Sequence, residues 1–76
     1  MNLISRAPPR SCVFRASEVS GVWSVTKDGV FYGDYMTRDQ AIRGACYGAR
    51  AVEAVGGSAQ VLAAPGDQLV AHRERA

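Results

Sequence analysis

The sequence predicts an α+β fold, in which one helix packs on one face of an antiparallel sheet of about four strands. Two runs rich in β-branched and aromatic residues flank a short loop at Lys27–Gly29, and an alanine-rich helical segment follows them. Two shorter β-rich runs then surround a Pro-Gly turn at positions 65–66. The predicted order of elements is therefore β-β-α-β-β.

The length and composition limit the chain to one small domain. Of the 76 residues, 47% are hydrophobic, but only sixteen are Leu, Ile, Val or Phe, so the predicted core is shallow. A chain this short buries a limited share of its surface, and self-association is one way to bury more. The length excludes a multidomain enzyme and the large dinucleotide-binding or barrel folds. We expect a flexible arm over residues 1–11, a domain over 12–73 and a frayed tail over 74–76.

The first predicted hairpin has two competing registers. A two-residue turn at positions 28–29 competes with a three-residue loop that pairs Thr26 with Val30. Because a one-residue slip moves every side chain to the other face, separation of apolar from polar residues decides between them, and it favours the longer loop. Gly33 then lies opposite Trp23. This register assigns to the core face Trp23, Val25, Phe31, Gly33 and Tyr35, and to the other face Val22, Ser24, Thr26, Val30, Tyr32 and Asp34.

The helix has start and stop signals in the sequence. Thr37 can cap its first turn while Gln40, three residues on, completes a capping box. Gly56 and Gly57 end it after about Val55. Its apolar stripe is mostly Ala and Gly, so large aromatic residues of the hairpin can fill the contact: Ala41, Ile42, Ala45, Gly48, Ala49 and Val52. The predicted core consists of Trp23, Val25, Phe31, Tyr35, Ile42, Ala45, Ala49 and Val52. Residues 12–16 could add a short edge strand, and the sequence leaves this open.

No residue pattern predicts an active site. His72 is the only histidine, and we expect it to be exposed to solvent at a strand end, without a partner that orients it. Cys46 is expected to act as a small hydrophobic residue, and Cys12 to be open to oxidation or cross-linking. One histidine and two cysteines that are distant in the sequence supply too few ligands for a metal site. We therefore expect no catalytic activity, no cofactor and no metal.

The motifs of the central region resemble a known class of domains. Trp23-x-Val25, a Gly-containing hairpin and Thr37-x-x-x-Ala41-Ile42 are followed by a Gly-Gly helix stop. Over about Val22 to His72, this pattern resembles small bacterial domains of unknown function with a Trp-x-Val strand and a Thr-x-x-x-Ala-Ile helix start. The resemblance implies a β-β-α-β-β fold and no particular activity.

A second resemblance concerns DNA-binding domains. The same stretch is similar to the three-stranded sheet and helix of plant-type and integrase-arm DNA-binding domains, with Tyr35-Met36-Thr37 in place of their Phe-x-Thr element. That resemblance implies contact with the major groove through the exposed face of the sheet. Here that face would offer Ser24, Thr26, Val30, Tyr32 and Asp34.

From these observations we predict a small cytoplasmic, non-catalytic domain that acts through protein–protein contact. Its partner is expected to be a second copy, in a homodimer, or another protein. Exposed apolar side chains on a small protein usually mark such a contact, and the predicted interaction face consists of Val22, Val30 and Tyr32. No apolar run approaches the ~20 residues that a membrane-spanning helix needs, so no membrane association is expected.

The alternative prediction is weak nucleic-acid binding. Arg6, Arg10 and Arg15 give residues 1–17 a charge of +3, whereas the remaining residues carry six basic and seven acidic side chains. A domain dedicated to duplex DNA usually concentrates its positive charge on the folded surface. Binding would therefore depend on the basic arm, with Lys27 beside the sheet as the nearest further cation.

Overall fold

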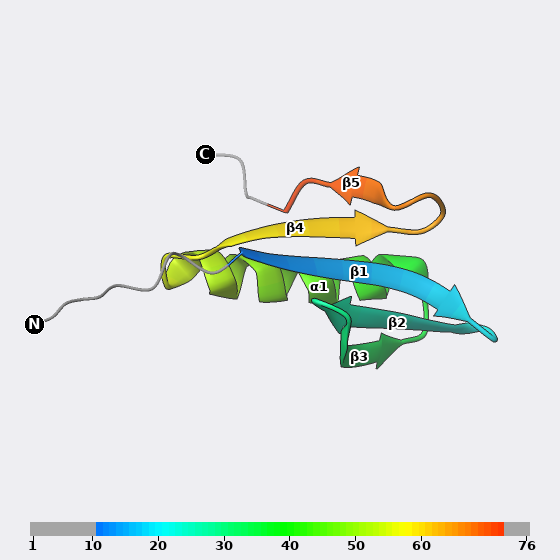
Figure 1. Cartoon of the computed structure of the whole chain (residues 1–76). Helices are drawn as coiled ribbons and strands as arrows, with labels where there is room; N and C mark the ends of the chain where they lie inside the picture. The colour runs from blue at the N-terminus through cyan, green and yellow to red at the C-terminus, as the bar shows by residue number, and fades with distance from the viewer. Residues whose placement is uncertain (1–10, 73–76) are drawn as a thin grey trace, which may run out of the picture.

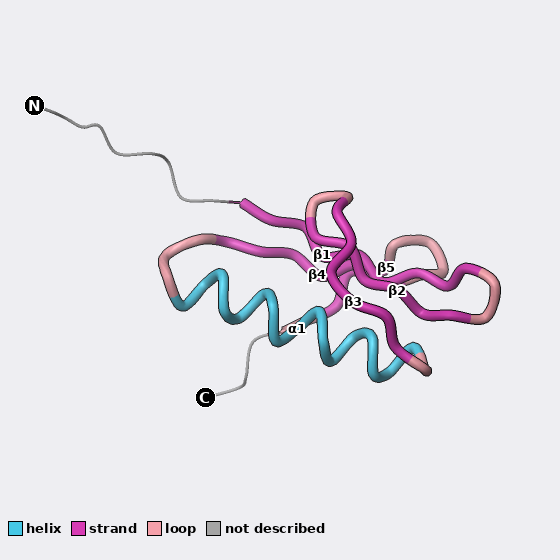
Figure 2. Tube along the Cα trace, turned by 90° about the horizontal axis from the view of Figure 1, so that it is seen from below, coloured by secondary structure: helices cyan, strands magenta, loops and turns pink. Residues whose placement is uncertain are grey.

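The computed structural model describes residues 11–72, in which five strands form one sheet and a single helix covers one of its faces (Figure 1). The predicted α+β class is confirmed, and Figure 2 shows the helix and the sheet as two layers. The expected arm and tail fall outside the described residues, apart from Ser11, which begins the first strand. In chain order the elements are β1 (Ser11–Val19), β2 (Val22–Lys27), β3 (Val30–Tyr35), α1 (Arg38–Ala54), β4 (Ser58–Ala63) and β5 (Gln68–Val70).

The strands are arranged in the order β3-β2-β1-β4-β5. β1 pairs antiparallel with β2 but parallel with β4, so the sheet is mixed, with one strand more than expected. Residues 12–16 belong to a central strand and not to a short edge strand, because β1 runs for nine residues through the centre of the sheet. Its side chains alternate between buried and more exposed positions, as expected for a strand with one face against a helix.

The hairpin of β2 and β3 combines features of both predicted registers. Asp28 and Gly29 have φ values of 52° and 83°, and Lys27 pairs with Val30, so the turn has two residues and not three. A β-bulge then inserts Tyr32 as an extra residue, and beyond it Val25 pairs with Gly33. The bulge restores the predicted sharing of one face by Trp23, Val25, Gly33 and Tyr35, although Trp23 lies opposite Tyr35 and not opposite Gly33.

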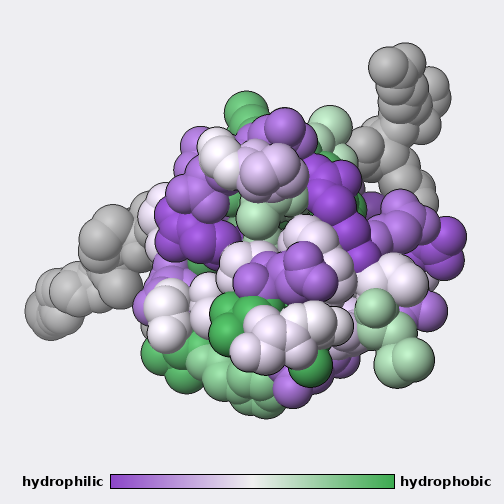
Figure 3. All heavy atoms as spheres, turned by 90° about the vertical axis from the view of Figure 1, so that its right-hand side faces the viewer, coloured by the Kyte–Doolittle hydropathy of each residue, from purple (hydrophilic) through white to green (hydrophobic). Residues whose placement is uncertain are grey.

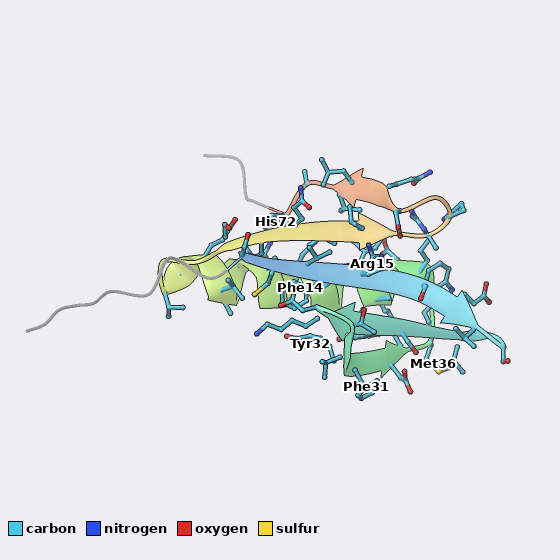
Figure 4. All side chains as sticks on the ribbon, viewed as in Figure 1. Phe14, Arg15, Phe31, Tyr32, Met36 and His72 are labelled. Carbon is cyan, nitrogen blue, oxygen red and sulfur yellow. The ribbon has the colours of Figure 1, made fainter. Side chains whose placement is uncertain are left out.

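The two-residue turn and the bulge together reverse the predicted positions of two aromatic residues. Phe31 pairs with Thr26 on the face away from the helix and is 67% exposed, so its assignment to the core is wrong. Tyr32 instead lies on the helix side, where its ring makes an edge-to-face contact with Phe14 at 5.2 Å between centroids. Figure 4 shows Phe31 at the outer margin of β3 and Tyr32 beside Phe14.

The core lies between α1 and the sheet, and Phe14 of β1 is its largest fully buried side chain among the described residues. The ring fits beneath Gly48, where a Cβ atom would lie only 2.6 Å from Phe14 Cε2. Of the predicted core, Val25, Ala45 and Ala49 are buried, and Trp23, Tyr35, Ile42 and Val52 are half-buried against it. The buried residues are Cys12, Phe14, Ala16, Val25, Ala41, Ala45, Cys46, Gly48, Ala49, Val61 and Ala63.

The predicted ends of the helix are confirmed. The Thr37 hydroxyl accepts a hydrogen bond from the Gln40 N–H at 3.1 Å. The Gln40 side chain accepts one from the Met36 N–H at 3.3 Å, one residue earlier than in a standard capping box. At the other end, the N–H groups of Gly56 and Gly57 return to carbonyls of the last turn at 3.0 Å, and Gly56 has a φ of 93°. This is a Schellman motif.

Candidate functional site

The structure separates the three residues of the predicted interaction face. All three side chains are exposed. Val22 pairs with Val19 and lies on the face of the sheet away from the helix, which we call the open face. Val30 pairs with Lys27 on the helix side, and the bulge places Tyr32 on that side as well. These residues therefore cannot form one contact surface.

A different set of apolar side chains is exposed around the open side of β1, β2 and β3, where the polar Ser24–Asp34 pair lies between Phe31 and Val22. We call Val19, Val22, Phe31 and Met36 the β2–β3 patch. Val22 pairs with Val19, Phe31 lies on the open side of the edge strand, and Met36 directly follows that strand. Their exposed fractions lie between 43% and 83%. Figure 3 shows hydrophobic surface gathered along the edge of the molecule that β3 forms.

Two pairs of polar side chains on the open face bond to each other. Arg15 Nε donates to Asp67 Oδ1 at 3.1 Å, which joins the central strand to the turn before β5. The Ser24 hydroxyl donates to Asp34 Oδ1 at 2.6 Å. The positive charge of Arg15 is thus already paired with a carboxylate, and Asp34 has a hydroxyl as its hydrogen-bond donor, so these groups offer no uncompensated positive charge.

The residues of the predicted nucleic-acid contact are not brought together either. Arg6 and Arg10 lie outside the described residues. Arg15 lies on the open face in its ion pair with Asp67, whereas Lys27 points to the helix side, with its ammonium 5.9 Å from the centroid of the Phe14 ring. Two cations on opposite faces of a sheet cannot follow one phosphate backbone.

On the helix side, α1 and β3 enclose a shallow groove of about 470 Å³. The helix contributes residues spaced three, four and seven apart, which therefore form one stripe. The helix and β3 approach each other most closely at Gly44, where any Cβ atom would collide with the hydroxyl end of Tyr35. We call this site the tyrosine groove, and it is lined by Tyr32, Tyr35, Gln40, Arg43, Gly44 and Tyr47.

The polar groups of the tyrosine groove are mainly hydrogen-bond donors. Burial raises the pKa of the Tyr35 hydroxyl above its ordinary value, and the neighbouring Tyr32 raises it further, so Tyr35 remains a neutral donor. The Gln40 side-chain oxygen already accepts from Met36, which leaves its amide hydrogens as the available group. Arg43 supplies a guanidinium, and Arg50 lies 5.0 Å from the centroid of the Tyr47 ring.

His72 is not exposed at a free strand end, contrary to expectation. Its Nε2 lies 3.0 Å from Glu53 Oε2, and the two side chains are only 10% and 19% exposed. The His72 carbonyl also accepts a hydrogen bond from Arg50 at 2.9 Å. These contacts hold the segment after β5 against α1. His72 also lines a pocket of about 450 Å³ together with residues of β4 and β5.

Both cysteines are buried free thiols in the described structure. Burial raises the pKa of the Cys46 thiol, and Arg50 opposes this only in part, so the thiol stays protonated at neutral pH. Cys46 thus packs as the small hydrophobic residue that the sequence predicts. Cys12 is buried on the helix side of the central strand, so the expectation that it is open to oxidation is wrong.

Comparison with models of known protein families, with curated proteins and with solved structures found no match. The resemblance to small bacterial domains therefore stays a prediction. Among residues 11–72, no helix combines the length and the apolar composition that crossing a membrane requires.

Sequence reasoning missed the tyrosine groove and the β2–β3 patch for one reason. Both depend on which side of β3 each aromatic residue takes, and the two-residue turn and the bulge determine that together. The sequence did contain one indication of the groove. Gln40, Gly44 and Tyr47 are spaced three and four residues apart, which places them on one stripe of the helix. This stripe marks the margin of α1 that faces β3.

Proposed function

We propose that this chain is a non-catalytic protein–protein interaction domain that forms a homodimer through the β2–β3 patch. The observation that carries this proposal is the number of exposed apolar side chains in the half of the sheet that ends at the edge strand β3, namely Val19, Val22, Phe31 and Met36. Apolar patches on a small folded protein usually mark contacts with another protein.

The charges of the open face disfavour a nucleic-acid partner. Arg15 is already paired with Asp67, and Asp34 adds a carboxylate, so the face has little to offer the phosphates of a nucleic acid. A second copy, in a two-fold arrangement, presents the same apolar side chains in return.

The small core provides a reason for self-association. Phe14, Val25 and Val61 are the largest fully buried side chains in the described part of the chain, and most other core residues are alanine. A domain of this size gains little from its own core, and burial of Phe31 and Met36 between two copies would add to it. We further propose that the domain acts in the cytoplasm, where Cys12 and Cys46 stay reduced.

Sedimentation equilibrium over a range of protein concentrations tests this proposal. We expect a monomer–dimer equilibrium, and Phe31→Gln should raise its dissociation constant by at least about tenfold, because a buried aromatic anchor is lost. Val55→Gln is the matched control, since Val55 is an exposed apolar residue at the far end of α1. It should leave the equilibrium unchanged.

Two outcomes would overturn the homodimer. One is a protein that remains monomeric at every concentration, and the other is an equal effect of Phe31→Gln and Val55→Gln. A parallel titration with a short DNA duplex at low salt distinguishes the alternative. Monomeric protein that binds the duplex, and loses it on deletion of residues 1–10, would favour nucleic-acid binding.

A further inference from the structure

The tyrosine groove lies on the opposite side of β3 from the β2–β3 patch, and the two share no residue. Its volume of about 470 Å³ falls within the roughly 300–1,000 Å³ of small-molecule sites. Three aromatic rings line it, two from β3 and Tyr47 from α1. Aromatic rings offer planar apolar surface, so the body of a suitable ligand is flat and apolar.

The polar groups around these rings select the charge of the ligand. None of the lining residues that the structure describes is acidic, whereas Arg43 is a permanent cation. The tyrosine hydroxyls and the amide hydrogens of Gln40 can donate hydrogen bonds. Donors and a cation together favour an anion.

Arg43 already has a carboxylate partner, but a weak one. Its Nη2 lies 3.3 Å from Asp39 Oδ2 one helical turn away, and both side chains are mostly exposed. Exposed pairs of this kind contribute at most about 1 kcal/mol. The guanidinium can therefore turn from Asp39 to a ligand in the groove at little cost in free energy. Its contact with Asp39 shows that Arg43 can donate to a carboxylate in this position.

We propose that the tyrosine groove binds a small organic anion with an aromatic body, whose ring lies against Tyr32 and Tyr47 and whose carboxylate binds Arg43. Gly44 contributes to the shape of the groove, because the absence of a side chain there lets the Tyr35 ring lie directly against the helix. The inference does not depend on dimer formation, since it concerns the other side of β3.

Amide-resolved NMR titration of the full chain tests it with two probes of the same shape, phenylacetate and the uncharged phenylacetamide. We expect saturable shifts at Gly44 and Tyr47, and phenylacetate should bind about three- to tenfold more tightly than phenylacetamide. Arg43→Gln should remove this difference without weakening the amide. Tyr47→Ala should weaken both probes.

Arg15→Gln is the matched control, because it removes a cation from the open face and should change neither affinity. Equal binding of the two probes by the parent protein would overturn the proposed anion preference. Shifts that fail to saturate, or that lie outside the groove, would overturn the site itself. Sedimentation measures dimer formation separately, so failure of either proposal leaves the other open to its own test.

Discussion

Phe14 and Phe31 lie in opposite environments. Phe14 is the largest buried side chain of the described residues, whereas Phe31 is exposed on the open face. The cause is local in each case. The two-residue turn pairs Phe31 with Thr26 on the open face, and the pairing of β1 on both sides places Phe14 at the centre of the sheet.

Phe14→Ala should therefore lower the free energy of unfolding by about 3–5 kcal/mol, because it leaves a cavity beneath Gly48. Phe31→Ala should change it by no more than about 0.5 kcal/mol in the monomer. Urea unfolding followed by circular dichroism, at a concentration where the protein is monomeric, measures both.

A loss of that size approaches the whole stability of a small domain, so Phe14→Leu serves as a milder variant. It retains most of the volume and should still lower the free energy of unfolding by about 1 kcal/mol. If Phe31→Ala proved the more destabilising alanine substitution, the face assignment of β3 would be wrong.

The positions of Phe31 and Tyr32 illustrate why side-chain faces are hard to predict in a short hairpin. Asp28–Gly29 is typical of a two-residue turn, and the apolar pattern beyond it is typical of the other register. Each indication is right in its own part of the hairpin, and the bulge reconciles them. If a single register is assumed for the whole hairpin, either the turn signal or the apolar pattern has to be rejected.

At the scale of elements, the ends of α1 could be predicted because their determinants are local. The Thr37 cap lies within three residues of its partner, and the glycine stop bonds to carbonyls of the preceding turn. The central place of β1 could not be predicted in this way. It depends on parallel pairing with β4, which follows only after two strands and the helix.

The cap of α1 gives a prediction at this scale. Thr37→Ala removes the acceptor for the Gln40 N–H and should lower the free energy of unfolding by about 1 kcal/mol. Thr37→Ser keeps the hydroxyl and should cost much less, so it controls for the loss of the methyl group. Chemical denaturation of the three proteins measures both effects. Equal losses for Ala and Ser would show that the hydroxyl does not cap the helix.

At the scale of the whole molecule, contacts distant in sequence hold the margin of the sheet to the helix. β5 pairs with β4 over only three residues, so its ladder alone holds it weakly. Arg38 at the start of α1 donates to the Ala64 carbonyl at 2.8 Å and to Gln68 at 3.1 Å. Arg50 and Glu53 near its end hold His72. The helix thus fastens both ends of the β5 segment.

This arrangement predicts that β5 separates locally from β4, without global unfolding, when its contact with one end of α1 is removed. His72→Ala abolishes the contact between the ring and Glu53, and its loss should cost roughly 1–1.5 kcal/mol locally. Native-state hydrogen exchange should then be about tenfold faster at the protected amides of β5. Amides of β1 should change much less, because β1 is paired on both sides.

Arg43→Ala is the control for this prediction, since it also removes a charged contact of α1, but an exposed one within the helix. It should leave exchange in β5 unchanged. Equal acceleration in β1 and β5 would mean that His72 contributes to global stability and not to the margin alone. No acceleration in β5 would mean that the Arg38 contacts and the short ladder suffice to hold the strand.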